Sequence, residues 1–157
     1  MSNFTVGSAR RVNSPQSGAG PMDAHDYQIP DDLMYTKEHE WAKELGQVVR
    51  IGITDYAAKT LNDVVYVTSP KLNDRVEHMK TLGTVESIKA VSEVYAPVSG
   101  KVVRVNDQLD AHPELVNKSP YGEGWLIEVA PSNLGDERKS LLDAKGYAAY
   151  LNTLLKK

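Results

Sequence analysis

The stretch that decides the fold is Thr84–Gly100, which reads TVESIKAVSEVYAPVSG. Two strand-like halves flank Ser87–Ala90, a segment short enough to connect them as a turn. This pattern predicts a β-hairpin with Lys89 at or beside its tip. A lysine in an arbitrary hairpin turn is usually a solvated surface residue. An enzyme that modifies the ε-amine needs the same exposed placement, so position alone leaves both interpretations open.

Short strand patterns surround the hairpin. Apolar residues alternate with a period of two in four segments: Gln47–Ile53, Asp63–Thr68, Lys101–Val105 and Trp125–Val129. Turn residues separate the segments, which predicts a mainly β fold, a sandwich or flattened barrel of two antiparallel sheets. We expect Trp125 to share a face with Ile127 and Val129. The expected core between the sheets comprises Val49, Ile51, Val65, Val67, Val103, Ile127 and Val129.

Helical patterns are short. Thr54 or Asp55 is suited to cap a helical turn that reaches Leu61. Near the C-terminus, leucines and tyrosines recur at helical spacing, and Gly146 is expected to separate two short helices. We expect these helices to cover one side of the sheets.

The chain has 157 residues, which favours one domain with a tail. Residues 1–22 are rich in Ser, Gly, Asn and Pro, and only Arg10 and Arg11 are charged before Pro21. We interpret 1–22 as a disordered leader, either a native segment, a transit peptide or a remnant of expression, with Met22 as an alternative start. Residues 23–157 are expected to form the single domain.

Composition excludes several classes of function. Lys and Arg number 18 against 21 Asp and Glu, and this net charge of −3 gives no reason to expect nucleic acid or an anionic membrane as a partner. No apolar run is long enough to span a bilayer. The chain has no cysteine, which excludes disulfides, thiolate metal sites and a cysteine nucleophile. Any sulfur chemistry therefore needs an attached group.

No catalytic motif is found. His39-Glu40 begins like the zinc-protease motif HExxH, but Lys43 stands where the second histidine must be. The four histidines have no ligand spacing, so no metal site is expected. No phosphate-binding glycine loop and no nucleophile elbow occurs.

Several segments together resemble the glycine cleavage system H protein family. The hairpin segment VESIKA, at 85–90, is followed by YAPVSGKV at 95–102, and both are similar to the lipoyl-attachment hairpin of that family. Further similar segments are YTKEHEW (35–41), GITDYA (52–57), DVVYV (63–67), SPYGEGWLI (119–127) and LLDA (141–144). Biotinyl carriers have methionines beside the lysine, whereas Ile88 and Ala90 stand here.

The resemblance implies a carrier, not an enzyme, with lipoate attached covalently to Lys89 as the cofactor. A lysine amine is mostly protonated near pH 7, so its acylation needs an activated donor and a lipoate ligase or lipoyl transferase. The attached arm would take an aminomethyl group from glycine at the P protein and pass it to the T protein. The L protein would then reoxidise the dithiol.

Other site residues follow from the resemblance. Glu40 and Glu93 fall where the family has acidic residues that hold the loaded arm, whereas Glu38 falls where some members have serine. Glu86 is expected to matter for recognition by the ligase. Trp41 and Trp125 are expected to be packing residues. For the glutamates, plain surface acids remain the alternative.

Two alternatives remain open at this stage. A lipoyl-relay protein that donates lipoate to 2-oxoacid dehydrogenases would keep Lys89 and Glu86. An interaction module that has lost the cofactor would leave Lys89 bare. The compartment is expected to be the cytoplasm in a bacterium or the mitochondrial matrix in a eukaryote.

Overall fold

A computed structural model describes residues 23–156 of the chain. The predicted leader, residues 1–22, lies outside the described residues, as does residue 157. The elements in chain order are η1 (Ala24–Asp26), β1 (Met34–Tyr35), β2 (Glu40–Leu45), β3 (Val48–Ile53), α1 (Asp55–Leu61), β4 (Val64–Thr68), β5 (Arg75–Val76), β6 (Thr81–Ser87), β7 (Val91–Tyr95), β8 (Gly100–Val105), α2 (Gln108–Ala111), α3 (Leu115–Lys118), β9 (Ile127–Pro131), α4 (Leu134–Glu137), η2 (Arg138–Ser140) and α5 (Ala144–Leu155).

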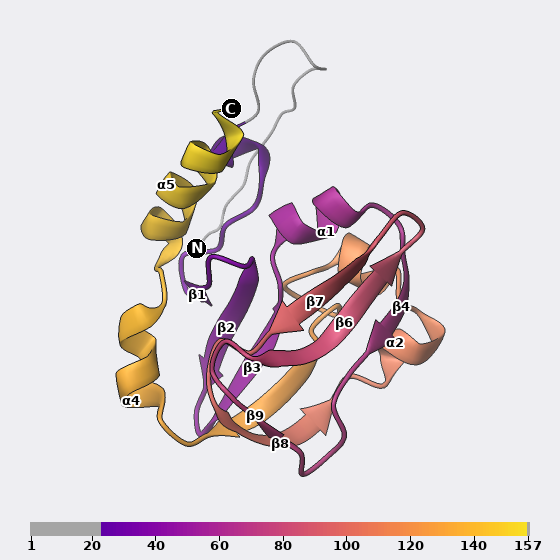
Figure 1. Cartoon of the computed structure of the whole chain (residues 1–157), viewed down its shortest axis with the longest axis vertical. Coiled ribbons are helices and arrows are strands. Elements are labelled where there is room, and N and C mark those ends of the chain that lie inside the picture. The colour runs from indigo at the N-terminus through magenta and orange to yellow at the C-terminus, as the bar shows by residue number, and fades with distance from the viewer. Residues whose placement is uncertain (1–22, 157) are drawn as a thin grey trace.

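Two antiparallel sheets form the body of the molecule, as the sequence predicts. The six-stranded sheet has the order β1-β2-β3-β9-β8-β5, and the three-stranded sheet has the order β4-β6-β7. Figure 1 shows the β6–β7 hairpin crossing in front of the larger sheet. Buried side chains from both sheets form one core, and five of the seven expected core residues belong to it: Val49, Ile51, Val67, Ile127 and Val129.

The other two expected core residues are exposed, and both lie at β-bulges. Val65 is 48% exposed because β4 shifts register against β6 between Val64 and Tyr66, which turns Val65 outward. Val103 is 37% exposed. On β8 the neighbouring Val102 takes the core position, and the register against β9 shifts between Val102 and Arg104.

Helix α1 agrees with its prediction, because the Thr54 hydroxyl oxygen caps it by accepting the N–H of Ala57. The prediction of two C-terminal helices separated at Gly146 is wrong. Helix α5 runs through Gly146, whose N–H donates to the capping carboxylate of Asp143 at 2.8 Å. Gly146 lies in the first turn of α5 and not in its interior, where a glycine destabilises a helix most, so the helix does not end there. Leu142 is extended instead and exchanges backbone hydrogen bonds with Tyr35.

The predicted strand Trp125–Val129 begins only at Ile127, and Trp125 does not share the face of Ile127. Asn106 fixes the irregular approach to β9, since its amide donates to the carbonyls of Glu123 and Trp125 at 2.7 Å each. The Trp125 ring instead packs in a second, aromatic-rich cluster with Trp41. Both tryptophans are buried and serve packing, as expected.

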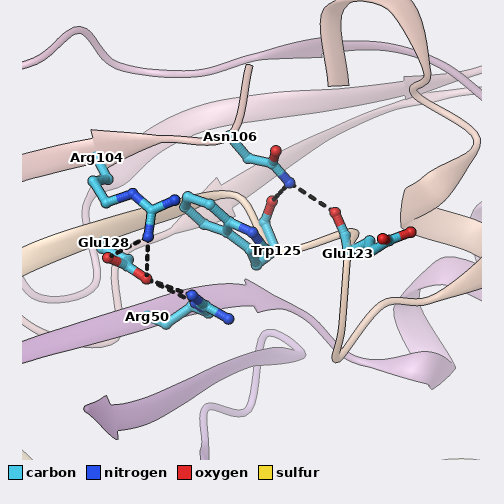
Figure 2. A network of polar contacts seen from close by, with 6 residues as sticks. All are labelled: Arg50, Arg104, Asn106, Glu123, Trp125 and Glu128. Carbon is cyan, nitrogen blue, oxygen red and sulfur yellow. Dashed lines mark hydrogen bonds and ion pairs between the residues drawn. The ribbon is translucent and has the colours of Figure 1, made fainter. Parts of the chain in front are cut away.

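A charged row crosses the outer face of the larger sheet beside Trp125 (Figure 2). Arg50 on β3, Glu128 on β9 and Arg104 on β8 are cross-strand neighbours. The Glu128 carboxylate is buried, with Arg50 Nη2 at 2.7 Å and Arg104 Nη1 at 3.4 Å. Each guanidinium carbon also lies about 5 Å from the Trp125 ring centroid, at 4.8 and 5.0 Å. The row therefore ties three strands together.

The longest helix among residues 23–156 has 12 residues, and none there is long and apolar enough to cross a membrane.

Candidate functional site

The predicted hairpin is present, with Lys89 in its turn. β6 and β7 pair in antiparallel register, Glu86 opposite Val91, and the connecting residues 88–90 are exposed. Figure 1 shows this turn on the side of the molecule away from α5. Lys89 therefore lies where another protein can approach it.

Ser87 organises the turn from inside. Its N–H donates to the carbonyl of Ala90 at 2.8 Å, and its hydroxyl oxygen accepts the N–H groups of Lys89 and Ala90, each at 3.2 Å. The N–H of Ile88 donates to the carbonyl of Asp63 at 3.1 Å, which ties the turn to the start of β4. Hydrogen bonds at Ile88, Lys89 and Ala90 thus anchor the backbone of the turn that carries the lysine.

The side chain of Lys89 is free to extend. It is exposed, and no carboxylate of residues 23–156 lies within 4.0 Å of its ammonium. A primary amine on an anchored turn can form an amide without disturbing any ion pair of the described chain. The turn therefore fits a covalently attached acyl group such as lipoate.

Outward side chains on β7 lead from the turn towards a group of acids. Val94 is buried, so alternation points Val91, Glu93 and Tyr95 to the outer face of the small sheet. We call Glu38, Glu40, Glu93 and Tyr95 the acidic group. The charge of Glu93 is the main cause that raises the pKa of the Tyr95 phenol, and Glu38 and Glu40 add to it.

Glu40 is buried beneath this surface, with only 1% of its area exposed. Its Oε2 accepts the backbone N–H of Tyr95 at 2.9 Å, and Oε1 is hydrogen-bonded to the Thr36 hydroxyl. Burial raises the pKa of Glu40 to about 7, although these two hydrogen bonds oppose the rise. Glu40 therefore changes charge near neutral pH in a place that solvent does not reach directly.

The neighbouring His39 has a structural role. It has a φ of 75°, in the left-handed region, and its Nδ1 lies 2.9 Å from the hydroxyl of Tyr147 on α5. Burial lowers the pKa of His39 to about 4, so the ring is neutral at pH 7. It links the turn before Glu40 to α5.

The structure brings Glu40 and Glu93 together, but of these two only Glu93 faces solvent, together with the exposed Glu38. The exposed pair can attract an ammonium group. Glu86 lies nearer the turn, in a cross-strand row with Tyr66 and Val91. The expected roles of these glutamates remain predictions.

Sequence reasoning missed Ser87 and Tyr95. A serine two residues before a turn lysine is a recognisable signal, because its hydroxyl can accept the backbone N–H groups of a tight turn. Tyr95 lies two residues after Glu93, so strand alternation would have placed it on the same face.

A shallow depression of about 410 Å³ borders the other side of the turn. Its lining residues are Ala58, Lys59, Asn62, Asp63, Ile88 and Asn117. Between residues 23 and 156 no cluster of three or more His, Asp or Glu side chains is arranged to hold a metal ion.

Comparisons with known proteins agree with one another. The profile of the family described as "Glycine cleavage H-protein" matches residues 33–154. A probable glycine cleavage system H protein of Pyrococcus furiosus is 51% identical over 134 residues, covering 85% of this chain and 99% of the relative. The glycine cleavage system H protein of an Anaeromyxobacter species is 50% identical over 124 residues, covering 79% and 96%. The crystal structure of a glycine cleavage system H protein from Mycobacterium marinum superposes with a TM-score of 0.71 at 38% identity, over 77% of this chain and 97% of that one.

Proposed function

Because the chain belongs to the glycine cleavage H-protein family, we propose that it is a non-catalytic lipoyl carrier with lipoate joined to Lys89. In this role it carries the aminomethyl group of glycine from the P protein to the T protein and reducing equivalents to the L protein. The observation that supports this most directly is the anchored turn, with an exposed amine that no described carboxylate neutralises.

Bound lipoate supplies the disulfide that this cysteine-free chain lacks. The residues of the chain do the rest. Ser87 and Asp63 hold the attachment point still, while Glu93 on β7 of the small sheet and Glu38 in the turn before β2 present negative charge to solvent. An aminomethyl group is cationic near neutral pH, so these carboxylates favour its retention close to the protein.

The buried Glu40 supports the exposed members of the acidic group from beneath the surface. Its bond to the N–H of Tyr95 holds the end of β7, and hence the Glu93–Tyr95 edge, against the Thr36–Glu40 turn. We assign Glu40 a positioning role for the acidic group.

The two relatives above come from an archaeon and a bacterium, which supports the cytoplasm as the compartment.

The test is intact and peptide mass spectrometry of the protein from its native host. We expect a lipoyl adduct on Lys89 and turnover of glycine when the modified protein is added to purified P, T and L proteins. A bare Lys89 in an extract that contains lipoate ligase activity would refute the carrier function. Modified protein that fails with P, T and L proteins but donates lipoate to a 2-oxoacid dehydrogenase would show the relay function instead.

A further inference from the structure

Exposed apolar and basic side chains gather at the β5–β8 edge of the larger sheet. Six large apolar side chains are markedly exposed in the described chain, and four of them belong to the small sheet and its turn. The other two are Leu72 (58% exposed) and Val103 (37%). Three exposed cations accompany this pair, and we call the five residues the distal patch: Leu72, Arg75, Lys101, Val103 and Arg104.

Cross-strand pairing places two of the cations side by side. Arg75 on β5 is paired with Lys101 on β8. Both side chains point away from the core, because the next residue along each strand, Val76 or Val102, is buried in it. No carboxylate of residues 23–156 lies within 4.0 Å of either cation. Their charges are therefore available to a partner.

The bulge in β8 adds Val103 and Arg104 to this edge. It inserts one extra residue between Val102 and Val105, which both pack against the core, so the two residues between them are exposed. Leu72 lies in the turn before β5, and the two residues after it exchange backbone hydrogen bonds with Val102 at 2.9 and 2.8 Å. Local backbone features thus hold the distal patch together.

Arg104 is fixed in place and keeps free donors. Its guanidinium carbon lies 5.0 Å from the Trp125 ring centroid, and its Nη1 contacts the Glu128 carboxylate at 3.4 and 3.5 Å (Figure 2). Arg50 binds Glu128 more closely, from Nε at 2.8 Å and Nη2 at 2.7 Å. The other N–H groups of Arg104 have no acceptor within residues 23–156, and its side chain is 61% exposed. A fixed guanidinium with free N–H groups is suited to bind a carboxylate.

The distal patch is remote from the attachment turn. The two sheets share one core, so the outer face of the larger sheet points away from the small sheet that carries Lys89. Figure 1 shows β8 low in the view and the connection between β6 and β7 at the upper right. A protein bound to the distal patch therefore leaves the turn uncovered and an attached arm free to move.

The composition of the distal patch indicates the kind of partner. Protein interfaces combine apolar side chains with arginine, whereas nucleic acid and anionic membranes are bound chiefly by dense positive charge. The patch joins two large apolar side chains to three cations, in a chain whose net charge is −3. A protein surface with carboxylates around an apolar centre is complementary to it.

We propose that the distal patch docks an acidic surface of an enzyme that acts on the far end of the lipoyl arm. This inference rests on the proposed function, which attaches the arm to Lys89. The P, T and L proteins react with the end of an extended arm, so such an enzyme can hold the carrier at a surface distant from the turn. Docking there keeps the arm close to the active site at a high effective concentration and does not restrict its motion.

The experiment uses the lipoylated chain with purified P, T and L proteins. The KM of each enzyme for the carrier is measured at low and at physiological ionic strength. Arg75→Glu and Lys101→Glu reverse a charge of the patch, Arg104→Gln removes one, and Leu72→Ser removes an apolar contact. Lys145→Glu is the matched control, because Lys145 is exposed in the first turn of α5 and has no carboxylate of the described chain within 4.0 Å. Far-UV circular dichroism and thermal melts confirm that each variant is folded.

We expect Lys101→Glu to raise the KM of at least one of the three enzymes about tenfold with kcat unchanged, because the new carboxylate repels the acidic surface. Arg75→Glu and Arg104→Gln should raise the same KM and weaken its dependence on salt. Leu72→Ser should raise this KM without changing the salt dependence. Lys145→Glu should behave like the wild-type protein.

Acylation by a lipoate ligase is the second readout. It should proceed at the wild-type rate in every variant, since the distal patch lies away from the turn. Unchanged KM values for all three enzymes in all four patch variants would overturn the inference, as would an equal loss of acylation.

Two further outcomes are distinguishable from these. Self-association of the chain that Lys101→Glu abolishes, measured by sedimentation velocity, would assign the patch to a second copy and overturn the inference. Wild-type lipoylated protein that supports no glycine turnover would instead refute the proposed function.

Discussion

The backbone N–H of Tyr95 donates to Oε2 of the buried Glu40 at 2.9 Å, which joins two segments 55 residues apart in the chain. This bond connects the start of β2 in the larger sheet to the end of β7 in the smaller one. It holds the buried carboxyl group of Glu40, whose pKa is raised, against the backbone of Tyr95 and beneath the exposed members of the acidic group. The charge of Glu40 therefore bears on stability near pH 7.

The first prediction concerns the pH dependence of stability. Burial raises the pKa of Glu40 from 4.5 to about 7, so the folded state holds this proton more tightly than the unfolded state does. The stabilisation is complete below pH 4.5 and is lost as the pH rises to about 7. The loss amounts to at most about 3 kcal/mol for a shift of this size. His39 has the opposite sign, because its pKa is lowered to about 4 and its contribution is lost as the pH falls from 6.5.

Glu40→Gln removes the pH dependence of stability that Glu40 causes and keeps the one that His39 causes. The free energy of unfolding of wild type minus that of Glu40→Gln should therefore decrease between pH 4.5 and 7 and level off above. Urea unfolding at several pH values measures it. A difference that does not vary with pH would contradict the raised pKa.

The second prediction separates the attachment point from the fold. Lys89→Arg keeps the charge of an exposed turn side chain, so the free energy of unfolding should stay within about 0.5 kcal/mol of wild type. The guanidinium cannot serve as the acyl acceptor at neutral pH. Lipoylation and glycine turnover should both disappear, as measured by mass spectrometry and by release of CO₂ from glycine. Turnover by the Lys89→Arg protein would refute the mechanism.

The third prediction concerns the anchoring of the turn. Ser87→Ala removes the oxygen that accepts the N–H groups of Lys89 and Ala90, which should cost about 1 kcal/mol. Amide hydrogen exchange at Lys89 and Ala90 should accelerate. The matched control is Ser92→Ala on β7, whose hydroxyl makes only a 3.5 Å contact with the carbonyl of Glu93 and should leave both amides unchanged.

The fourth prediction compares a buried and an exposed carboxylate. Glu128→Ala leaves Arg50 half-buried without a partner and should destabilise the protein by about 3 kcal/mol. Glu44→Ala removes an exposed pair with Arg138 and should cost no more than about 1 kcal/mol. Chemical denaturation of both variants checks the contrast. Equal effects would show that the Arg50–Glu128–Arg104 row contributes little.

Sequence reasoning predicted the parts of the fold that local patterns determine. The hairpin at Lys89, the strands at Val48–Ile53 and Val64–Thr68 and the capped helix α1 all match. The errors arose where a single extra residue or a long-range contact decides the outcome. A bulge reverses Val65 relative to Val67, and no local pattern announces it.

In the candidate site, too, local features could be predicted from the sequence and long-range contacts could not. The motif located Lys89, since a turn lysine is fixed by residues close in the chain. It could not show that Glu40 is buried, because that depends on packing against Tyr95 from another sheet. Likewise, Trp125 left its expected face because Asn106, 19 residues away, holds its carbonyl.

The anchoring of the turn has a kinetic consequence for any group attached to Lys89. Because hydrogen bonds with Ser87 and Asp63 hold the backbone of the turn, the attachment point moves little. The motion of an attached group therefore comes from rotation about the single bonds of the lysine side chain and its extension. The reactive end then explores a bounded shell around one point on the surface. An active site within this shell encounters it at an effective concentration set by geometry, typically of millimolar order, however dilute the carrier itself is.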